Sequence, residues 1–433
     1  MAPLFTPSKS QKVVLKLEKK LNDQIKNEYK KKSKVKLLLL LISIIITILL
    51  IGVYPTIGAV DVSVSDTYTV ILNKISPDHF NIEPKENELI FTVSDDPYLI
   101  KDGLENGIVT ERLKDAFYNE NKKLSDDLTV YSSNGRWILT DNSSGVKYIM
   151  KEDADGLAVY NTFPQEFIND TVWERINRCM IGLLIGAGLA ISGTTMQGIL
   201  RNRFASPFTL GIFPMATVGV VIGRSFGLGI YLTVLLSFFF AFLPFIFYYY
   251  LSRYREVGPE MMVLIGIALV FTLLPLSIMG GFGSIKAVSW SSIIIISVSI
   301  IVCFLVLMFI AWDINMISLG DITAKTLGIE VDRIKLVSLC ISSFIVAIIV
   351  SFASMIPFIG LVAPFLCRPV IGNDNRFLLP SAAFVGASLV LMLDGLGRMV
   401  MAPMILPAGV LSMFLGGPVL LYLAIRKEKQ GWL

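Results

Sequence analysis

Three arginines and one aspartate flank two long apolar stretches, where fixed charges could bind a carboxylate. Arg175 and Arg178 stand immediately before one apolar run, and Arg398 closes another. A guanidinium forms bidentate, charge-assisted hydrogen bonds with carboxylates and also steers acidic partners toward it. Asp394 stands four residues before Arg398, so we expect it to share a helical face with that arginine and hold it in place. The arginines would then dock an acidic partner, or else anchor lipid headgroups or cap helices.

A second candidate site is the polar loop 316–335, the longest polar loop that follows the arginine pair. Gly328 is expected to divide this loop into two short helical pieces. The charged side chains of Asp321, Lys325 and Arg333 are candidates for contacts with a partner. The alternative is that the loop is a plain amphipathic connector between two apolar helices.

The remaining residues argue against catalysis within this chain. His79 is the only histidine, and we interpret it as a surface residue rather than a haem ligand. The sequence contains no G-x-x-x-x-G-K-[ST] motif, so it cannot bind ATP through a P-loop. We therefore expect no enzyme, no cofactor and no metal site. Four cysteines lie in or beside apolar runs and are expected to be small apolar residues of membrane helices rather than disulfide partners: Cys179, Cys303, Cys340 and Cys367.

The composition is that of a membrane protein. Of the 433 residues, 54% are hydrophobic and 17% are charged, whereas soluble domains carry about 25% charged residues. Long apolar runs recur with short gaps, which predicts an all-α polytopic membrane protein with about ten transmembrane helices. The expected spans are 37–53, 179–199, 207–223, 229–251, 260–280, 291–312, 334–356, 358–371, 379–397 and 405–425.

Charge is strongly segregated along the chain, and this sets the expected topology. Residues 1–36 carry 11 Lys/Arg against 3 Asp/Glu, whereas residues 61–174 carry 10 against 22. By the positive-inside rule the basic segment 1–36 is cytoplasmic, and 37–56 forms the first transmembrane helix. An even number of spans returns the C-terminus to the cytoplasm. Residues 173–433 then form the transmembrane core.

The polar segment 57–172 is expected to be an inserted extracellular α+β domain. Strand-like pieces at 88–93, 135–140 and 146–150 are separated by turn signals, and 107–118 is an amphipathic helical candidate. A segment of this length can fold as a small domain. Two roles remain open for it: contact with a partner or substrate at the entrance, or shielding of that entrance.

The order of short motifs along residues 175–425 resembles a known family of permeases. The motifs are Arg175-Ile176-Asn177-Arg178, Gly186-Ala187-Gly188-Leu189-Ala190 with Gly193 and Gln197, Asn202 to Gly211, Leu319-Gly320-Asp321 with Ala324, Leu327 and Gly328, Pro357 to Pro364, Asp394 to Arg398, Leu406-Pro407-Ala408-Gly409-Val410 and Gly416-Gly417-Pro418. In this order they resemble FecCD-type permeases of ABC importers for iron-siderophores, haem and cobalamin. Three positions depart from the family pattern: Asn177 and Arg203 stand where the family has proline, and Phe365 where it has histidine.

The resemblance implies a type II ABC importer permease fold and a transport subunit for an iron chelate, a siderophore or haem. It implies that Arg175, Arg178 and Arg398 dock an extracellular substrate-binding protein, with Asp394 in support. It also implies partners: two cytoplasmic ATPase subunits and a second permease subunit, identical or paralogous. The residues implied in ATPase coupling are Gly320, Asp321, Ala324, Lys325, Leu327, Gly328 and Arg333.

The implied location is the plasma membrane of a bacterium with a single membrane, where the binding protein would be a lipoprotein. No nucleic-acid partner is expected. Two alternatives are an ion-coupled secondary transporter and a membrane receptor that uses 57–172 to bind a ligand. The first would need ionisable groups within the membrane, and only Asp394 comes near. The many spans and the loop 316–335 argue against the second.

Overall fold

The computed structural model describes a helical bundle and a small antiparallel sheet. The described residues are 33–57, 64–75, 89–93, 128–133, 136–141, 147–153, 156–160, 165–254, 258–279, 285, 288–352, 356–400 and 406–425. His79, the helix expected at 107–118 and most of the basic segment 1–36 lie outside these residues. The C-terminal cations at 426–429 also lie outside them.

The bundle begins with an N-terminal helix, Ser33–Thr56, whose last turn is the 3-10 helix η1 (Tyr54–Thr56). The helices that follow in the bundle are α4 (Gln165–Leu200), α5 (Ile212–Ser225), α6 (Ile230–Tyr254), α7 (Pro259–Met279), α8 (Trp290–Phe309), α9 (Ala311–Leu319), α10 (Asp321–Thr326), α11 (Val331–Phe352), α12 (Ile359–Ile371), α13 (Asn375–Val400) and α14 (Ala408–Ile425).

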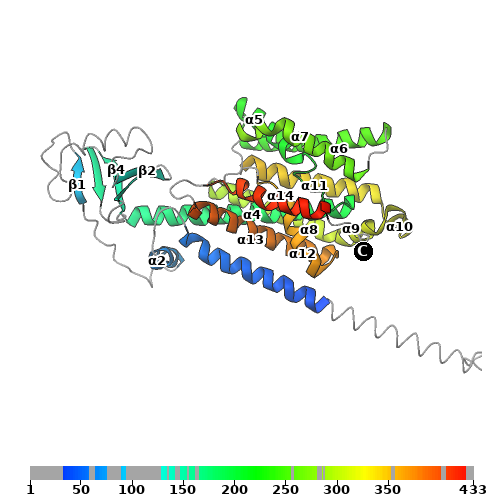
Figure 1. Cartoon of the computed structure of the whole chain (residues 1–433), viewed down its shortest axis with the longest axis horizontal. Helices are drawn as coiled ribbons and strands as arrows, with labels where there is room; N and C mark the ends of the chain where they lie inside the picture. The colour runs from blue at the N-terminus through cyan, green and yellow to red at the C-terminus, as the bar shows by residue number, and fades with distance from the viewer. Residues whose placement is uncertain are drawn as a thin grey trace, which may run out of the picture.

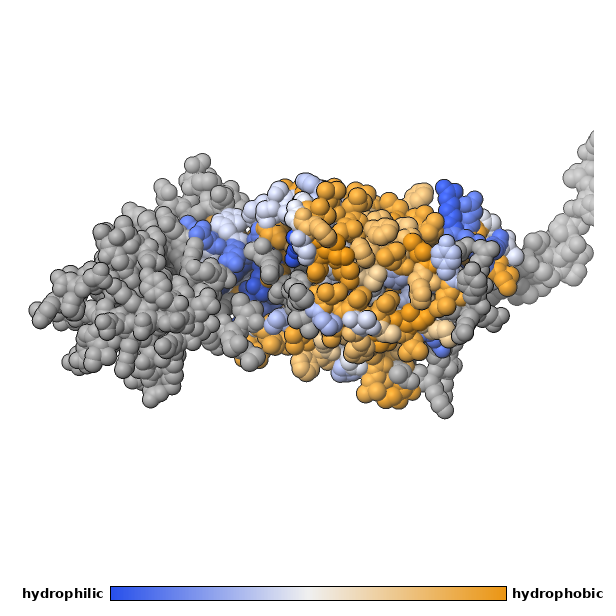
Figure 2. Space-filling view, turned by 90° about the horizontal axis from the view of Figure 1, so that it is seen from above, coloured by the Kyte–Doolittle hydropathy of each residue, from blue (hydrophilic) through white to orange (hydrophobic). Residues whose placement is uncertain are grey.

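Each expected span coincides with one apolar helix of the described residues. Six helices are long and apolar enough to cross a membrane, and four shorter ones, α5, α7, α12 and α14, match the remaining expected spans. Two of the short helices follow prolines, Pro207 and Pro357, that lie in breaks of the helical backbone. A helical membrane protein is therefore what the structure supports, while the number of crossings stays a prediction. The face of the bundle shown in Figure 2 is mostly apolar along its middle, with polar residues gathered toward the two ends.

The centre of the bundle is the antiparallel pair α4 and α13, which pack along each other. Small residues permit the approach: a Cβ added to Gly186 would lie 2.3 Å from the carbonyl oxygen of Gly386. Close backbone contact of this kind is a common way for membrane helices to associate. In Figure 1, α5, α6 and α7 lie on one side of this pair and the N-terminal helix on the other.

The N-terminal helix runs parallel to α13 and contacts it at three levels. Lys36 lies 3.9 Å from the carboxylate of Asp374, just before α13 begins. Near the middle, the hydroxyls of Thr47 and Ser388 are 2.9 Å apart. At the far end the hydroxyl of Tyr54 donates to Asp394. Most of its remaining surface is apolar and exposed, as expected of a helix that faces lipid.

Five strands form one antiparallel sheet between the N-terminal helix and α4 in sequence. They are β1 (Leu89–Val93), β2 (Leu128–Ser133), β3 (Arg136–Asp141), β4 (Lys147–Asp153) and β5 (Gly156–Tyr160), in the spatial order β1-β5-β4-β3-β2. Consecutive strands from β2 to β5 pair as a meander, and β1 pairs with β5. A helix, α2 (Val64–Ile75), precedes the sheet.

The sheet agrees in part with the expected inserted domain. The three strand-like pieces coincide with β1, β3 and β4, while β2 and β5 were not predicted. The helix α4 begins at Gln165, seven residues before the expected boundary at residue 172. An apolar-run criterion misses this extension, since the first turns of α4 are polar. The sheet lies beyond the end of the bundle where α4 begins, and α10 lies at the opposite end (Figure 1).

Candidate functional site

Asp394 is the centre of a buried charge cluster at the sheet-bearing end of the bundle. It lies on α13 and is 1% exposed. Arg178 of α4 holds it from two nitrogens: Nη2 donates to Oδ1 at 2.8 Å, and Nε donates to Oδ2 at 3.1 Å. This two-nitrogen arrangement is the geometry that makes arginine–carboxylate pairs strong. The side chain of Arg178 remains 14% exposed.

Arg398 approaches the same carboxylate from one helical turn further along α13. Its Nε lies 3.2 Å from Oδ2 of Asp394, and its Nη1 donates to the backbone oxygen of Ile57 at 2.8 Å. The guanidinium also stacks over the ring of Tyr54, 4.2 Å from its centroid. Among the described residues, Nη2 of Arg398 has no hydrogen-bond partner, although the residue is only 4% exposed. The pairing expected from the four-residue spacing is therefore present.

Arg175 binds the backbone of the segment that ends the N-terminal helix. Its Nη1 donates to the backbone oxygen of Pro55 at 3.0 Å, and the residue is 5% exposed. Together with the bond from Arg398 to Ile57, this fixes the segment that leaves the N-terminal helix. Sequence analysis missed this segment entirely. The only signal was Tyr54-Pro55 directly after the first apolar run.

Glu174 adds a second carboxylate near the cluster. It lies close enough to Arg178 to act on it electrostatically. Buried charges are tolerated when hydrogen bonds and opposite charges compensate them. Here backbone oxygens, one tyrosine ring and the carboxylate that Arg178 and Arg398 share supply that compensation. The arrangement can hold these ends of α4 and α13 together.

The hydroxyl of Tyr54 is the simplest part of this cluster to remove. Replacing Tyr54 with phenylalanine deletes its hydrogen bond to Asp394 while keeping the ring beneath Arg398. A hydrogen bond to a charged, buried group contributes about 1.5–3 kcal/mol, so we expect a loss of that size in unfolding free energy. The measurement is denaturant unfolding of the purified protein in detergent.

Tyr68 offers the matched control for that measurement. Its hydroxyl donates to the backbone oxygen of Gly52 at 2.7 Å, but the side chain is 40% exposed and its partner is uncharged. Tyr68→Phe should therefore lower the free energy of unfolding by well under half of the loss expected for Tyr54→Phe. Equal losses at Tyr54 and Tyr68 would contradict a buried, charge-assisted bond to Asp394.

The loop 316–335 forms two short helices and the start of a third. Gly320 separates α9 from α10. Its φ of 136° is accessible to glycine but strained for other residues. Gly328, with a φ of 82°, ends the segment before α11, where the sequence predicted a break. Ala324 is fully buried against Ile317 and Val331, which anchors one face of α10.

Two apolar side chains are exposed at α10, one on the helix and one directly after it. Ile322 is 83% exposed and Leu327 is 61% exposed. Asp321 is held at the base by Lys335 at 2.6 Å and lies 3.7 Å from Arg201. Lys325 and Arg333 pair only with neighbouring acids of the same segment, and those pairs are solvent-exposed. Exposed pairs contribute little to stability, so both cations remain available to a partner.

The three positions that depart from the resembled family have ordinary local roles. The side chain of Asn177 donates to and accepts from the backbone of Val288. The backbone oxygen of Arg203 accepts from Gln197 at 3.0 Å. Phe365 packs edge-on against Tyr422. Within the described residues no group of three or more His, Cys, Asp or Glu side chains could hold a metal ion.

Comparison with known proteins assigns the family. The model of the FecCD transport family matches residues 143–426. The hemin transport system permease protein HmuU of Yersinia pestis is 34% identical over 288 residues, which cover 60% of this chain and 86% of that protein. The probable heme-iron transport system permease protein IsdF of Staphylococcus aureus is 27% identical over 280 residues, 62% of this chain and 86% of that protein.

A solved structure gives the same assignment at the level of fold. It is an inward-facing conformation of an ABC transporter assigned to the metal-chelate type, with 25% identity and a TM-score of 0.51. The match covers 58% of this chain and 86% of that one. The segment preceding residue 143, including the N-terminal helix, α2 and β1 to β3, lies outside the family match. The helical bundle, its motifs and these matches together show that the chain belongs to the FecCD transport family of ABC transporter permeases.

Proposed function

We propose that this chain is the permease subunit of an ATP-driven importer for an iron chelate, with haem as the favoured cargo. The proposal rests on the relatives, two of which are named for hemin or heme-iron transport. A siderophore is the runner-up cargo, since the family-level motifs do not separate the two. The chain would open and close a path between its helices and those of a second permease subunit. It would carry out no covalent chemistry.

The structural observation that carries the proposal is the pair of exposed apolar side chains at α10. Ile322 on α10 and Leu327 directly after it are exposed, whereas Ala324 between them is buried and anchors the helix. Exposed apolar patches rimmed by charges are typical of protein–protein contacts. We infer that α10 and its flanks seat in a separate ATPase subunit, two of which would serve a permease dimer. The contact set is Gly320, Asp321, Lys325, Leu327, Gly328 and Arg333, with Ile322 added from the structure, while the buried Ala324 supports α10 from within the chain.

At the other end, we propose that the arginine cluster receives carboxylates of an extracellular binding protein. Arg178 is the most accessible of the three, with 14% of its side chain exposed. Arg175 and Arg398 are 5% and 4% exposed, so direct docking on them requires the Tyr54–Ile57 segment to move. In this proposal the sheet lies outside the plasma membrane, α10 lies in the cytoplasm, and the binding protein is a lipoprotein.

No observation favours the two alternative functions. An ion-coupled transporter would use a buried carboxylate that can release its proton into the pathway. Asp394 is instead bound by Arg178 and Arg398. A receptor would not need the exposed face of α10. The alternatives therefore predict that this face can be altered without loss of transport or signalling.

Replacing Ile322 with aspartate tests the proposal directly. The change puts a charge into the contact, so we expect the ATPase subunit to co-purify at least about tenfold less and uptake to fall in parallel, because hot-spot losses at interfaces exceed about 1–2 kcal/mol. The measurement is ATPase recovered per tagged permease, together with uptake of haem and of a ferric siderophore.

Phe226 provides the control for that experiment. It is 78% exposed and lies at the C-terminal end of α5. Nearby Arg224 donates to the backbone oxygen of Ser351 at the C-terminal end of α11, whereas α10 adjoins the N-terminal end of α11. Aspartate at Phe226 makes the same chemical change far from α10 and should leave ATPase recovery unchanged. If Ile322→Asp retained wild-type ATPase binding and uptake, the proposed coupling surface would be wrong. If uptake persisted with an inactive ATPase, the importer itself would be wrong.

A further inference from the structure

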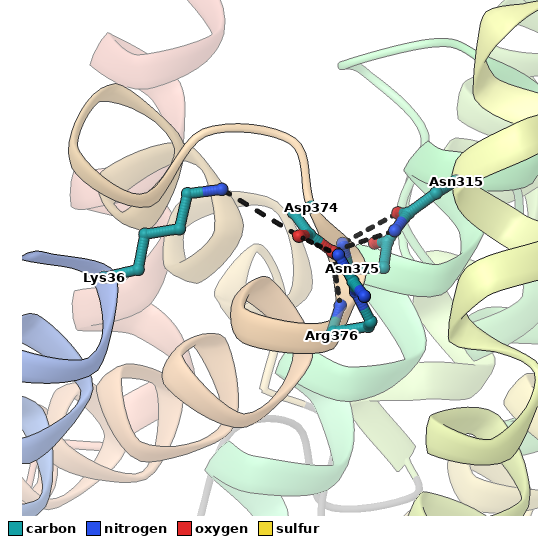
Figure 3. Close-up of polar contacts among 5 residues, drawn as sticks. All are labelled: Lys36, Asn315, Asp374, Asn375 and Arg376. Atoms are coloured by element: carbon teal, nitrogen blue, oxygen red, sulfur yellow. Dashed lines mark hydrogen bonds and ion pairs between the residues drawn. The ribbon is translucent and has the colours of Figure 1, made fainter. Parts of the chain in front are cut away.

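A second polar cluster lies where α9 meets the start of α13, and the established family assignment gives it no role (Figure 3). Its members are Asn315 from α9, Asp374, Asn375 and Arg376 from the α12–α13 turn and the first turn of α13, and Lys36 from the N-terminal helix. α9 continues through Gly320 directly into α10. The cluster therefore joins the helix that carries the exposed α10 to the helix that carries Asp394.

Asn315 makes three hydrogen bonds across this boundary. Its Oδ1 accepts from the backbone nitrogen and from Nδ2 of Asn375, each at 2.8 Å. Its Nδ2 donates to Oδ1 of Asp374 at 2.9 Å. Asn315 is 9% exposed and Asn375 is 2% exposed. A buried side chain of another helix thus satisfies one of the free N–H groups at the start of α13.

Asp374 completes the contact from the α13 side. Its carboxylate accepts from the backbone nitrogen of Arg376 at 3.2 Å and from that guanidinium at 2.9 and 3.0 Å. Burial alone would raise the pKa of the Asp374 carboxyl, but hydrogen bonds from Arg376 and Asn315 outweigh burial and hold the pKa below its usual value. Arg376 also stacks over Trp312 of α9, at 4.7 Å. Charge, hydrogen bonds and stacking all tie α9 to α13.

The start of α13 has more hydrogen-bond partners than an ordinary helix N-cap requires. An aspartate before a helix satisfies the first N–H groups without help from another helix. Here Asn315 takes the nitrogen of Asn375, while Asp374 takes that of Arg376. The cap of α13 is thus shared with α9, and α9 cannot shift without changing it.

Among the described residues, α13 holds buried side-chain polar atoms without a hydrogen-bond partner. They are Oδ1 of Asn375, the hydroxyl of Ser381, and Nε and Nη2 of Arg398. An unsatisfied buried polar group costs about 1–3 kcal/mol. α13 itself is continuous from Asn375 to Val400 and packs along α4.

We propose that Asn315, Asp374 and Asn375 form a joint that transmits displacement of α10 to α13, and through α13 to the Asp394 cluster. The proposal rests on the proposed function, since it assumes that an ATPase moves α10. Asn315 and Asp374 are positioning residues in it and touch neither cargo nor nucleotide. Lys36 links the joint to the N-terminal helix, which follows α13 to Tyr54.

An exchange of amide and carboxylate tests the joint. Asn315→Asp places two carboxylates opposite each other, so repulsion should open the joint. We expect haem transported per ATP hydrolysed to fall about tenfold, a size within the coupling energies found for hydrogen-bonded neighbours. Adding Asp374→Asn restores one donor and one acceptor across the boundary. The double variant should return to within about threefold of wild type.

ATPase binding, thermal unfolding and the basal hydrolysis rate are measured on the same full assemblies. The joint predicts that Asn315→Asp keeps its ATPase subunit and basal hydrolysis while transport is lost. Asn315→Ala removes the same hydrogen bonds without adding a charge, so it must show the same uncoupling. It provides the test if Asn315→Asp fails to fold. Asp313→Asn, on the same helix but outside the joint, should be unaffected.

Transport and hydrolysis that fall together in proportion to folded protein would overturn the joint, and so would a double variant no better than Asn315→Asp. Failure of the proposed function looks different, because the wild-type chain would then not co-purify with any ATPase. An intact, fully coupled Asn315→Ala assembly would leave the proposed function standing and remove only the joint.

Discussion

Replacing Asp394 with asparagine is expected to destabilise the folded chain by about 3–5 kcal/mol, the cost of leaving a buried ion pair without one partner. Asp394 is 1% exposed and compensates both Arg178 and Arg398. The amide keeps the shape but turns one acceptor into a donor that faces two cations. Denaturant unfolding in detergent, and the yield of folded protein, measure the loss.

Asp332 supplies the control, because its carboxylate also pairs with a cation but is 90% exposed in the side chain. Asp332→Asn should change stability by less than about 0.5 kcal/mol. Removing one of the stranded cations from the Asp394 variant, as in D394N with R398Q, should recover part of the lost stability. An Asp394→Asn protein that unfolds like wild type would show that the cluster does not hold α4 to α13.

The same cluster shows what sequence reasoning could reach. The pairing of Asp394 with Arg398 follows from a spacing of four on one helix, which is a local rule. The tighter contact, from Arg178, joins residues far apart in sequence and depends on the antiparallel packing of α4 and α13. Tyr54 and the backbone oxygens beside it carry no sequence signal for such a role. Local spacing therefore predicted the contact between Asp394 and Arg398, whereas the contacts from Arg178 and Tyr54 depend on tertiary packing.

The helices themselves were the easier part. In a membrane each backbone polar group must be satisfied within its own segment, so a long apolar run has few structural options besides a helix. The break at Gly328 was also predictable, because a glycine with positive φ ends a helix cheaply. The start of α4 was not, since its first turns are polar and belong to no apolar run. The joint of Asn315 with Asp374 was missed for the same reason as Arg178: only the fold brings α9 to α13.

The glycines of α4 differ in how closely a neighbouring helix approaches them. Small residues let the backbones of membrane helices come together. A Cβ on Gly193 would lie 1.8 Å from the carbonyl oxygen of Gly360, whereas one on Gly182 would lie 3.2 Å from a methyl group of Leu391. The first contact is backbone against backbone, and the second meets a side chain that can rotate away.

We therefore expect Gly193→Ala to cost about 3 kcal/mol or more, the upper range for overpacking, because α4 and α12 must move apart. Gly182→Ala should stay within about 1 kcal/mol of wild type, since alanine also favours the helix. Both are measured by unfolding in detergent and by uptake. A Cβ on Gly360 would lie 2.7 Å from the carbonyl oxygen of Leu189 and 3.1 Å from the ring of Pro207, so α12 also lies close to the break before α5. A Gly193→Ala protein with wild-type stability and uptake would mean that this backbone contact is not maintained in the membrane.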